Sequence, residues 1–162
     1  MTDAAPASAA HLDRAEPAVY KALLAVGKEA DAAAVRAGLD RRLIELVRVR
    51  ASQLNGCAFC LRMHTRDALT AGETTDRLAV LAAWRETDYF SSMERAALAI
   101  TESVTLIADR QAGRLVRTDE LSALSAQQHA AVRWLAIVIN SFNRVAITSH
   151  YPVAPAPSAV RA

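Results

Sequence analysis

The few glycine and proline residues of this chain stand between long stretches in which apolar residues recur at the spacing of an α-helix. There are five of each in 162 residues. They stand where helices usually begin or end, with proline at the start and glycine just past the end. No stretch shows the alternation of apolar and polar residues that marks a half-buried strand. The sequence therefore predicts an all-α fold, a single-domain bundle of about six to seven helices.

Capping signals set the expected helix boundaries. The patterns Ser91-x-x-Glu94 and Ser125-x-x-Gln128 are capping boxes ahead of apolar runs. Asn-Gly at positions 55–56 and glycine at position 72 are stop signals. The predicted helices cover residues 17–36, 41–55, 57–72, 74–84 and 92–107, a short segment that opens at Thr118, and 126–148.

The last predicted helix is apolar on nearly all sides, which indicates burial on more than one face. Part of that surface is expected at a subunit interface, so we predict a homo-oligomer. Trp84 and Trp134 are interpreted as core residues. The most apolar part, residues 130–143, contains Arg133 and is too short and too broken to be expected to span a bilayer.

Charge and the chain ends bound the remaining organisation. A net charge of +2, with arginines interspersed among acids, predicts no nucleic-acid partner and no membrane partner. We expect a helical domain over 15–150, a disordered N-terminal arm over 1–14, and a flexible tail rich in proline and alanine over 151–162. The N-terminus has no pattern of a secretory signal, so a cytoplasmic location is expected. There a cysteine pair is more often catalytic, redox-active or metal-binding than structural.

Both cysteines lie within four residues and are followed by a histidine. Cys57, Cys60 and His64 are spaced to share one face of a helix, whose N-terminal end favours an anion. A free thiol with a pKa of about 8.5 is only about 3% thiolate at pH 7, so a reactive thiol needs a lower pKa. A hydrogen bond from His64 to Cys60 is expected to help the helix terminus lower it. Cys57 is expected to be the more exposed thiol.

Glu45 lies in the middle of an apolar run on the preceding helix. One interpretation is a surface acid paired with Arg41, Arg42 or Arg48. The other is a proton acceptor that takes the thiol proton directly, through His64 or through water. A third interpretation of the whole stretch is inert packing, because buried free cysteines behave as small apolar residues.

The spacing Glu45, Cys57, Cys60, His64 resembles the E-x11-C-x2-C-x3-H signature of the alkyl hydroperoxidase D-like family, within the carboxymuconolactone decarboxylase superfamily. The resemblance covers roughly residues 15–148. It continues through 63–65, 71–74, 81–86 and 94–99. It implies an all-helical fold that assembles as trimers or hexamers.

The resemblance also implies roles for the four residues. Cys60 corresponds to the peroxidatic nucleophile, Cys57 to the resolving thiol, Glu45 to the general base and His64 to the proton relay. The implied activity is a thiol-dependent peroxidase in antioxidant defence, whose disulfide is reduced by a lipoyl-bearing or thioredoxin-like dithiol donor. No flavin, nicotinamide or haem motif is visible, so we expect no cofactor. Phe59 departs from the pattern, because alkyl hydroperoxidase D has a histidine before the second cysteine.

Other functions stay open. The dithiol could serve a general disulfide reductase or a redox-sensing oligomeric binding protein. Cys57, Cys60, His64 and Glu45 are also four acceptable zinc ligands, although a helical stripe aims them less convergently than a turn. A lactone decarboxylase is disfavoured, because the decarboxylases that share this fold generally lack the two cysteines.

Four further polar residues are given structural interpretations. His129 and His150 are expected at the surface or at an interface. Asn140 and Asn143 could cap an interface or reach the site, but local or inter-subunit hydrogen bonds are favoured for both.

Overall fold

Helices are the only regular elements in the part of the chain that the structure, a computed structural model, describes: residues 11–109 and 121–155. They are α1 (Leu12–Ala15), α2 (Pro17–Arg36), α3 (Arg41–Asn55), α4 (Ala58–Thr70), α5 (Thr75–Val80), the 3-10 helix η1 (Leu81–Glu86), α6 (Ser92–Thr105) and α8 (Ala126–Thr148). The predicted all-α class is confirmed. The helix start expected at Thr118 lies outside the described residues.

Local signals account for most of the boundaries. Pro17 opens α2, and both predicted capping boxes form at the starts of α6 and α8. The fourth predicted helix does not continue to Trp84 as an α-helix. It tightens into η1 at Leu81, and the backbone of Ala83 is non-helical (φ −113°, ψ 30°). A regular α-helix therefore ends one turn earlier than the pattern indicated.

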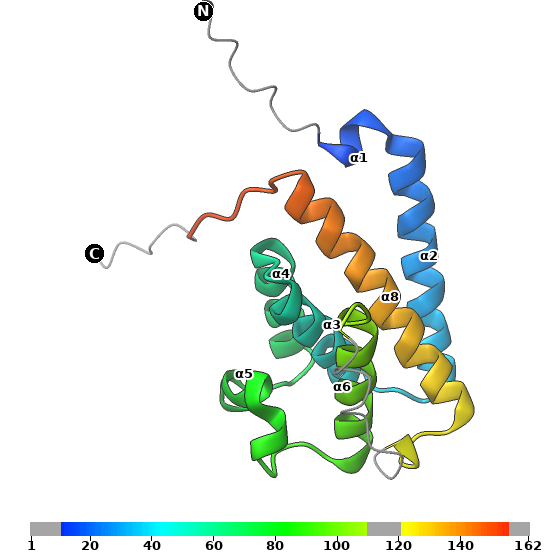
Figure 1. Cartoon of the computed structure of the whole chain (residues 1–162), viewed down its shortest axis with the longest axis vertical. Helices are drawn as coiled ribbons and strands as arrows, with labels where there is room; N and C mark the ends of the chain where they lie inside the picture. The colour runs from blue at the N-terminus through cyan, green and yellow to red at the C-terminus, as the bar shows by residue number, and fades with distance from the viewer. Residues whose placement is uncertain (1–10, 110–120, 156–162) are drawn as a thin grey trace, which may run out of the picture.

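Helix α1 lies largely in the segment assigned to an N-terminal arm and was not expected as an element. The backbone N–H of Leu12 donates to Ser149 Oγ at 3.1 Å, which ties α1 to the end of α8. Figure 1 shows α1 folded back between the start of α2 and the end of α8. Residues 1–10 and 156–162 of the two expected extensions lie outside the described residues.

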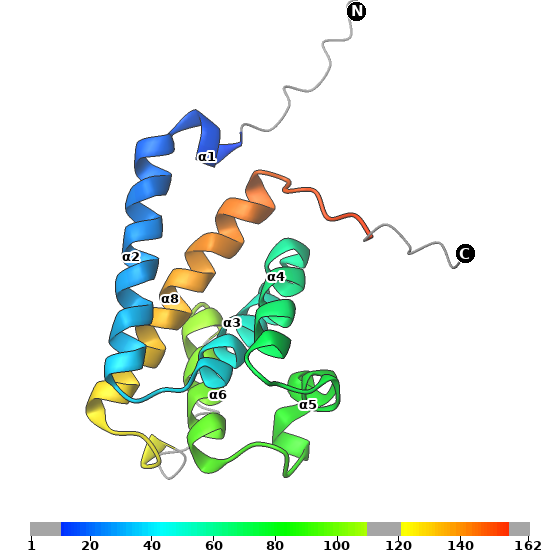
Figure 2. The same ribbon diagram turned by 180° about the vertical axis from the view of Figure 1, so that it is seen from behind.

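The bundle is organised around α3. This helix packs against α4, α6 and α8, while α2 runs alongside α8, as both views show (Figures 1 and 2). The middle of α3 is buried almost without interruption from Leu43 to Val47. An element surrounded on several sides can hold a polar side chain in a fixed, water-poor position. That is the setting of the candidate site.

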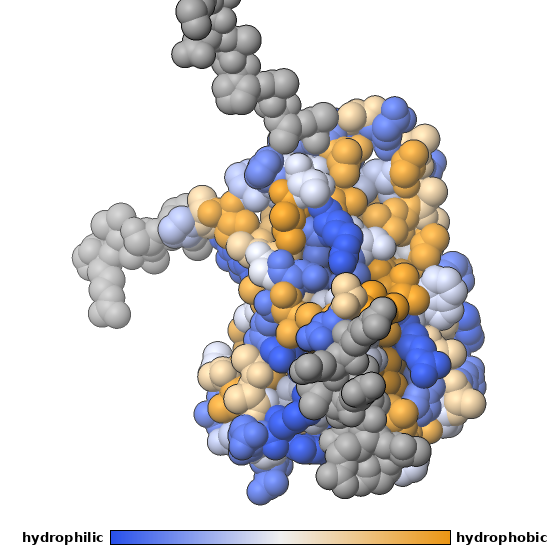
Figure 3. Space-filling model, viewed as in Figure 1, coloured by the Kyte–Doolittle hydropathy of each residue, from blue (hydrophilic) through white to orange (hydrophobic). Residues whose placement is uncertain are grey.

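The two tryptophans differ in burial. Trp84 is in the core, as expected. Trp134 is not, because 53% of its surface is exposed. It lies with Ile137, one turn later, on the outer side of α8. Apolar side chains gather over α2 and α8 on the face seen in Figure 3. This surface has no covering partner among the described residues.

Among the described residues, α8 is the one helix long and apolar enough to cross a membrane by length and composition. Helix α8 (Ala126–Thr148) is longer than its most apolar part, residues 130–143, which the sequence predicts to be too short to span a bilayer. Half of its most apolar window is buried inside the bundle, and the core helix of a folded domain meets the same criteria. This is weak evidence for a membrane span.

Candidate active site

A tight turn between α3 and α4 places the two cysteines. Gly56 caps α3 in the left-handed region (φ +66°), which favours glycine. The N–H of Cys57 donates to Ser52 O at 3.0 Å, which closes the turn. Cys57 is then the N-cap of α4, and its Sγ accepts a hydrogen bond from the N–H of Cys60 at 3.4 Å. The sequence prediction of a helix starting at the first cysteine is confirmed.

Both thiols are buried and free. Cys57 is 1% exposed and Cys60 is 2% exposed. The expectation that Cys57 is the more exposed thiol is therefore wrong, because the end of α8 packs against the start of α4 and covers it. The hydrogen bond from the Cys60 N–H to Cys57 Sγ keeps the two residues together. A disulfide between them requires only a local rearrangement.

The environment of Cys60 acts against a thiolate. The pKa of the Cys60 thiol is raised to about 12, chiefly by burial and also by the neighbouring Cys57, while a hydrogen bond with the Asn143 side chain acts in the opposite direction. The lowered pKa expected from the helix terminus is not observed, because desolvation outweighs it. The resting thiol is protonated at neutral pH, so its chemistry requires a base.

The candidate base is His64. Glu45 is fully buried and lies beside it. Its Oε2 is 2.8 Å from Nδ1 of His64. Its Oε1 accepts a hydrogen bond from Nη1 of Arg48 at 2.8 Å and forms an ion pair with Nη2 of Arg41, also at 2.8 Å. The expected pairing with two of the nearby arginines is confirmed, but the expectation of a surface acid is wrong. Arg42 pairs with Asp40 instead.

Glu45 is held in its ionised form. Burial alone would raise its pKa, but the hydrogen bond with His64 and the charges of Arg48, His64 and Arg41 outweigh burial and hold the pKa below its usual value. A carboxylate only accepts hydrogen bonds, so Nδ1 of His64 carries the proton and donates it to Glu45. Nε2 of a neutral His64 is then a free acceptor. This arrangement resembles the carboxylate–imidazole pair of nucleophilic enzymes.

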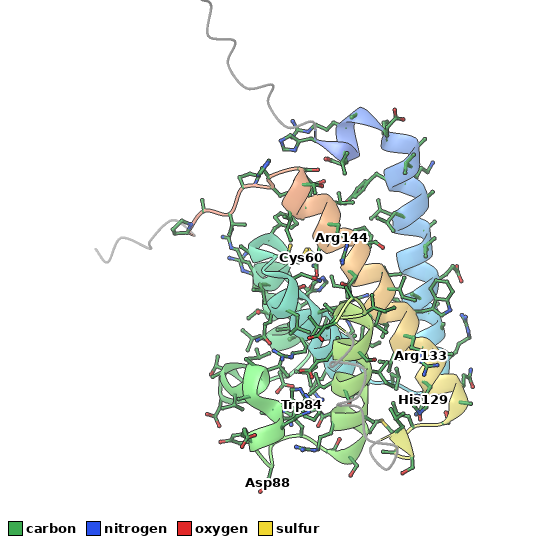
Figure 4. The ribbon with its side chains drawn as sticks, viewed as in Figure 1. Cys60, Trp84, Asp88, His129, Arg133 and Arg144 are labelled. Atoms are coloured by element: carbon green, nitrogen blue, oxygen red, sulfur yellow. The ribbon has the colours of Figure 1, made fainter. Side chains whose placement is uncertain are left out.

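A cavity of about 500 Å³ brings Cys60 and His64 onto one surface. Most of its wall is apolar and comes from α2, α4 and α8, with Phe59, Met63 and Phe142 among the lining side chains. Cys60 lies on α4 where that helix faces α8 (Figure 4). Among the described residues, no hydrogen bond joins His64 directly to Cys60; a substrate or a solvent molecule in the cavity can join them.

Asn143 is a site residue whose importance the sequence did not reveal. It is fully buried; its Nδ2 donates to Ser52 Oγ at 3.0 Å and its Oδ1 accepts from Asn55 Nδ2 at 2.8 Å. Asn55 also donates to Asn140 at 2.9 Å. These bonds fix the amide that contacts Cys60. The signal available in the sequence is an asparagine in an apolar helix, which allows it to reach the site but favours local or inter-subunit hydrogen bonds.

Three charged residues of the cavity wall were also missed. Lys28, Asp31 and Arg48 line it, and Arg48 bridges Glu45 to Asp31. Arg48 had been considered only as a partner of Glu45. The other two histidines singled out in the sequence are placed as follows: Nε2 of His129 contacts Leu121 O at 2.9 Å, and His150 follows α8 with a positive φ of 51°.

The described residues contain one group of candidate metal ligands within 4.8 Å of one another: Glu45, His64 and the exposed Asp67. Neither cysteine belongs to it. Both carboxylate oxygens of Glu45 already accept hydrogen bonds from cationic or imidazole groups. The zinc site of two cysteines, His64 and Glu45 that the sequence left open is therefore not assembled.

Comparison with known proteins places this chain in a family. The model of the carboxymuconolactone decarboxylase family matches residues 17–103, more than half of the chain. The uncharacterized protein YdfG of Bacillus subtilis (strain 168) is 38% identical over 117 residues, which are 69% of this chain and 76% of that protein. This chain belongs to the carboxymuconolactone decarboxylase family.

A solved structure shows which fold within this family the chain shares. The crystal structure of ATU0492 from Agrobacterium tumefaciens, described as a protein of unknown function and a candidate antioxidant defence protein AhpD, superimposes with a TM-score of 0.77. The two chains are 27% identical, and the match covers 91% of this chain and 100% of that one. The predicted alkyl hydroperoxidase D-like fold is confirmed. The family suggests an antioxidant, redox role for this chain.

Proposed function

We propose that this protein is a thiol-dependent peroxidase that reduces organic hydroperoxides with the Cys57–Cys60 dithiol. One observation carries the proposal most directly. Cys60, hydrogen-bonded to Cys57, lines the same cavity as His64, whose Nδ1 is bound to the ionised Glu45. A protonated thiol beside an oriented imidazole is the starting point for base-assisted attack.

The oxidation step uses the imidazole twice. Nε2 of His64 takes the proton of Cys60 as Sγ attacks the terminal peroxide oxygen. The O–O bond breaks, Cys60 becomes a sulfenic acid, and the leaving alkoxide takes the same proton and departs as an alcohol. Glu45 stabilises the transient imidazolium and fixes its orientation. In this proposal His64 is the proton acceptor, and Glu45, which the family pattern assigned as the general base, acts by orienting and stabilising His64.

The remaining steps regenerate the thiols. Cys57 attacks the sulfenic sulfur of Cys60, which forms the disulfide and releases water. A dithiol donor then reduces the disulfide by two exchange steps and leaves with its own sulfurs oxidised. Asn143 contributes by donating to the Cys60 sulfur when that atom carries negative charge. A lipoyl-bearing or thioredoxin-like donor fits this requirement.

The cavity wall favours an apolar peroxide. Phe59 occupies the position of the relay histidine and lines the cavity together with Met63 and Phe142. An apolar wall binds the organic part of an alkyl hydroperoxide by excluding water from it, and offers hydrogen peroxide little. With Phe59 in place of a histidine, the site lacks one proton-relay group and gains an apolar contact for the substrate.

We also propose that the protein is cytoplasmic and assembles as a homo-oligomer, a trimer or hexamer. Exposed apolar side chains on α2 and α8, among them Val19, Val26 and Trp134, supply a surface for association. Size-exclusion chromatography with light scattering measures the assembly. A monomer at micromolar concentration would contradict this part of the proposal.

Trapping experiments test the roles of the two thiols. Pre-reduced protein is treated with stoichiometric cumene hydroperoxide and a sulfenic acid probe, and the peptide containing both cysteines is analysed by mass spectrometry. We expect a Cys57–Cys60 disulfide in the parent, and sulfenic acid at Cys60 in Cys57→Ser. Unchanged hydroperoxide consumption by Cys60→Ser, with dithiothreitol supplied, would remove the proposal. Labelling of Cys57 alone, in Cys60→Ser, would reverse the two roles.

A general disulfide reductase is the second candidate, and the raised pKa of Cys60 favours it. A thiol with a high pKa gains little from being reduced and ionised, so its disulfide is more stable and the dithiol is a better reductant. Rates with cumene hydroperoxide and with a model protein disulfide, measured side by side, distinguish the two activities.

A further inference from the structure

The two sulfurs line different hollows. Cys60 lines the 500 Å³ cavity, whereas Cys57 lines a smaller hollow of about 180 Å³ between the start of α4 and the end of α8. Cys57 is absent from the lining of the large cavity, and Cys60 is absent from that of the small one. A molecule in one hollow therefore meets one cysteine only.

Aromatic side chains separate the two hollows. Phe59 and Tyr151 line both, and their rings pack edge to face with centroids 5.1 Å apart and planes at 77°. Tyr151 is held in turn by His11, whose ring stacks on it at 5.8 Å, and by a bond from its own N–H to Ala146 O at 3.0 Å. The partition thus combines α4 with the chain just before α1 and just after α8.

We infer that the two halves of the reaction use different entrances. The peroxide reaches Cys60 through the large cavity, and the dithiol donor reaches Cys57 through the small hollow. This inference rests on the proposed function and adds to it the place where the reductant binds. It also explains how a resolving cysteine that is 1% exposed can still be reduced by an external donor.

The chemistry of reduction agrees with this geometry. Exchange proceeds by attack of a thiolate on one sulfur of the disulfide, and access decides which sulfur is attacked. A donor thiolate in the hollow bonds to Cys57 Sγ, the S–S bond breaks, and Cys60 leaves as a thiolate that takes a proton from solvent. The donor's second thiol then attacks the donor sulfur of the mixed disulfide, which releases Cys57 and leaves the donor as a cyclic disulfide.

The depth of Cys57 selects the kind of donor. Because Cys57 lines a small hollow and is only 1% exposed, the attacking sulfur has to enter that hollow. A dithiol that is small, or carried at the end of a narrow arm, meets this condition. A thiol lying flush with the surface of a large folded domain does not, so of the two donor classes proposed above the inference selects the lipoyl-bearing one over the thioredoxin-like one.

Two matched substitutions test the separate entrances. Ile147 lines only the small hollow and is 41% exposed, while Leu24 lines only the large cavity and is 48% exposed. Each is changed to tryptophan, and the two half-reactions are followed separately by rapid quenching, alkylation of free thiols and mass spectrometry. Oxidation uses cumene hydroperoxide on reduced protein, and reduction uses dithiothreitol on protein oxidised beforehand with diamide.

We expect Ile147→Trp to slow reduction at least tenfold and to leave oxidation within about twofold of the parent. Leu24→Trp is expected to do the reverse. Ile147→Ala, which opens the hollow, is expected to be reduced faster than the parent. The inference is overturned if both tryptophan variants slow the two half-reactions in equal proportion, or if neither Ile147 variant changes the rate of reduction.

The two failures are distinguishable because diamide forms the disulfide without a peroxide. If cumene hydroperoxide does not oxidise the parent, the proposed peroxidase is wrong, while the reduction assay still tests the route to Cys57. If oxidation is normal and the Ile147 variants have no effect on reduction, the proposed function stands and the separate entrance does not.

Discussion

Two buried glutamates at different places in the bundle are surrounded by nearly the same groups. Glu45 on α3 is paired with two arginines, Arg41 and Arg48, and with the imidazole of His64. Glu102 on α6 also accepts from two arginines and from one aromatic N–H, the indole Nε1 of Trp84 at 2.8 Å. In both, burial would raise the pKa, and the surrounding donors and charges lower it below its usual value.

The ring that donates the N–H distinguishes them. An indole has one donor and no acceptor, so the cluster around Glu102 cannot pass a proton onward. An imidazole has a second nitrogen, and His64 presents it in a cavity that also holds Cys60. Figure 4 shows Cys60 and Trp84 well apart in the molecule. A buried carboxylate with a lowered pKa is therefore not by itself a sign of catalysis; the ring and the cavity decide.

The largest effect is expected when the imidazole is replaced by a group that donates but cannot carry a proton. His64→Gln can keep a hydrogen bond to Glu45 while it removes the proton acceptor. We expect the rate of Cys60 oxidation by cumene hydroperoxide to fall about 10²- to 10⁴-fold, the range typical of general acid–base catalysis. Rapid-quench thiol titration measures the rate.

The pH profile separates proton transfer from mere positioning in this variant. If His64 acts as the base, the oxidation rate of His64→Gln rises with pH toward that of the parent, because hydroxide removes the Cys60 proton in its place. A parallel profile with a constant deficit at every pH would indicate that His64 only positions its neighbours.

Removing the charge of the second carboxylate is expected to affect stability instead. Glu102→Gln leaves Arg50 and Arg85 without their shared anion, and breaking a buried ion pair by removing one partner costs about 3–5 kcal/mol. Urea denaturation measures the loss. Oxidation of Cys60 in the folded variant is expected to match that of the parent, and a reduced oxidation rate at full stability would contradict the structural role of Glu102.

Acid is expected to weaken the clusters in the same direction. The folded pKa of each carboxylate is below the unfolded value of 4.5, so the unfolded chain takes up these protons first as pH falls. Their stabilisation is present above about pH 4.5 and is lost as pH falls from there through the lower folded pKa values. Unfolding of the parent and of Glu102→Gln between pH 7 and pH 3 checks this. The gap in stability between them should narrow with acidification, and a constant gap would contradict it.

Local and long-range features of this chain differed in how well the sequence predicted them. The capping boxes at Ser91 and Ser125 and the glycine at position 56 depend on a few neighbouring residues, and α6, α8 and the α3–α4 turn formed where expected. Helix α1 depends on a bond from Leu12 to Ser149, 137 residues away, and it was missed. The exposure of Trp134 depends on which sides of α8 other helices cover, and it was wrong.

The site shows the same division. Cys57, Cys60 and His64 share one helix, so their common face followed from spacing, and the family pattern added Glu45. The raised pKa of Cys60 could not be predicted in this way. The helix terminus, which favours a thiolate, is visible in the local sequence, whereas the burial of Cys60 by α8, which raises the pKa, is not. Asn143 reaches the sulfur from a helix more than 80 residues away in sequence, and no spacing rule could have selected it.

The smallest effect is expected from removing the indole N–H without removing the ring. Trp84→Phe deprives Glu102 of one of its donors but leaves both arginines in place. A single hydrogen bond to a charged group contributes about 1.5–3 kcal/mol, and part of the loss here is offset by the remaining donors, so we expect destabilisation near or below the lower end of that range. Thermal unfolding measures it. The oxidation rate of Cys60 should be unchanged in Trp84→Phe. In His64→Phe, which removes the ring N–H beside Glu45, most of the oxidation rate should be lost. If Trp84→Phe and His64→Phe lost stability and activity to the same extent, the two glutamates would be equivalent. The proposed difference, that only the ring beside Glu45 transfers a proton, would then be wrong.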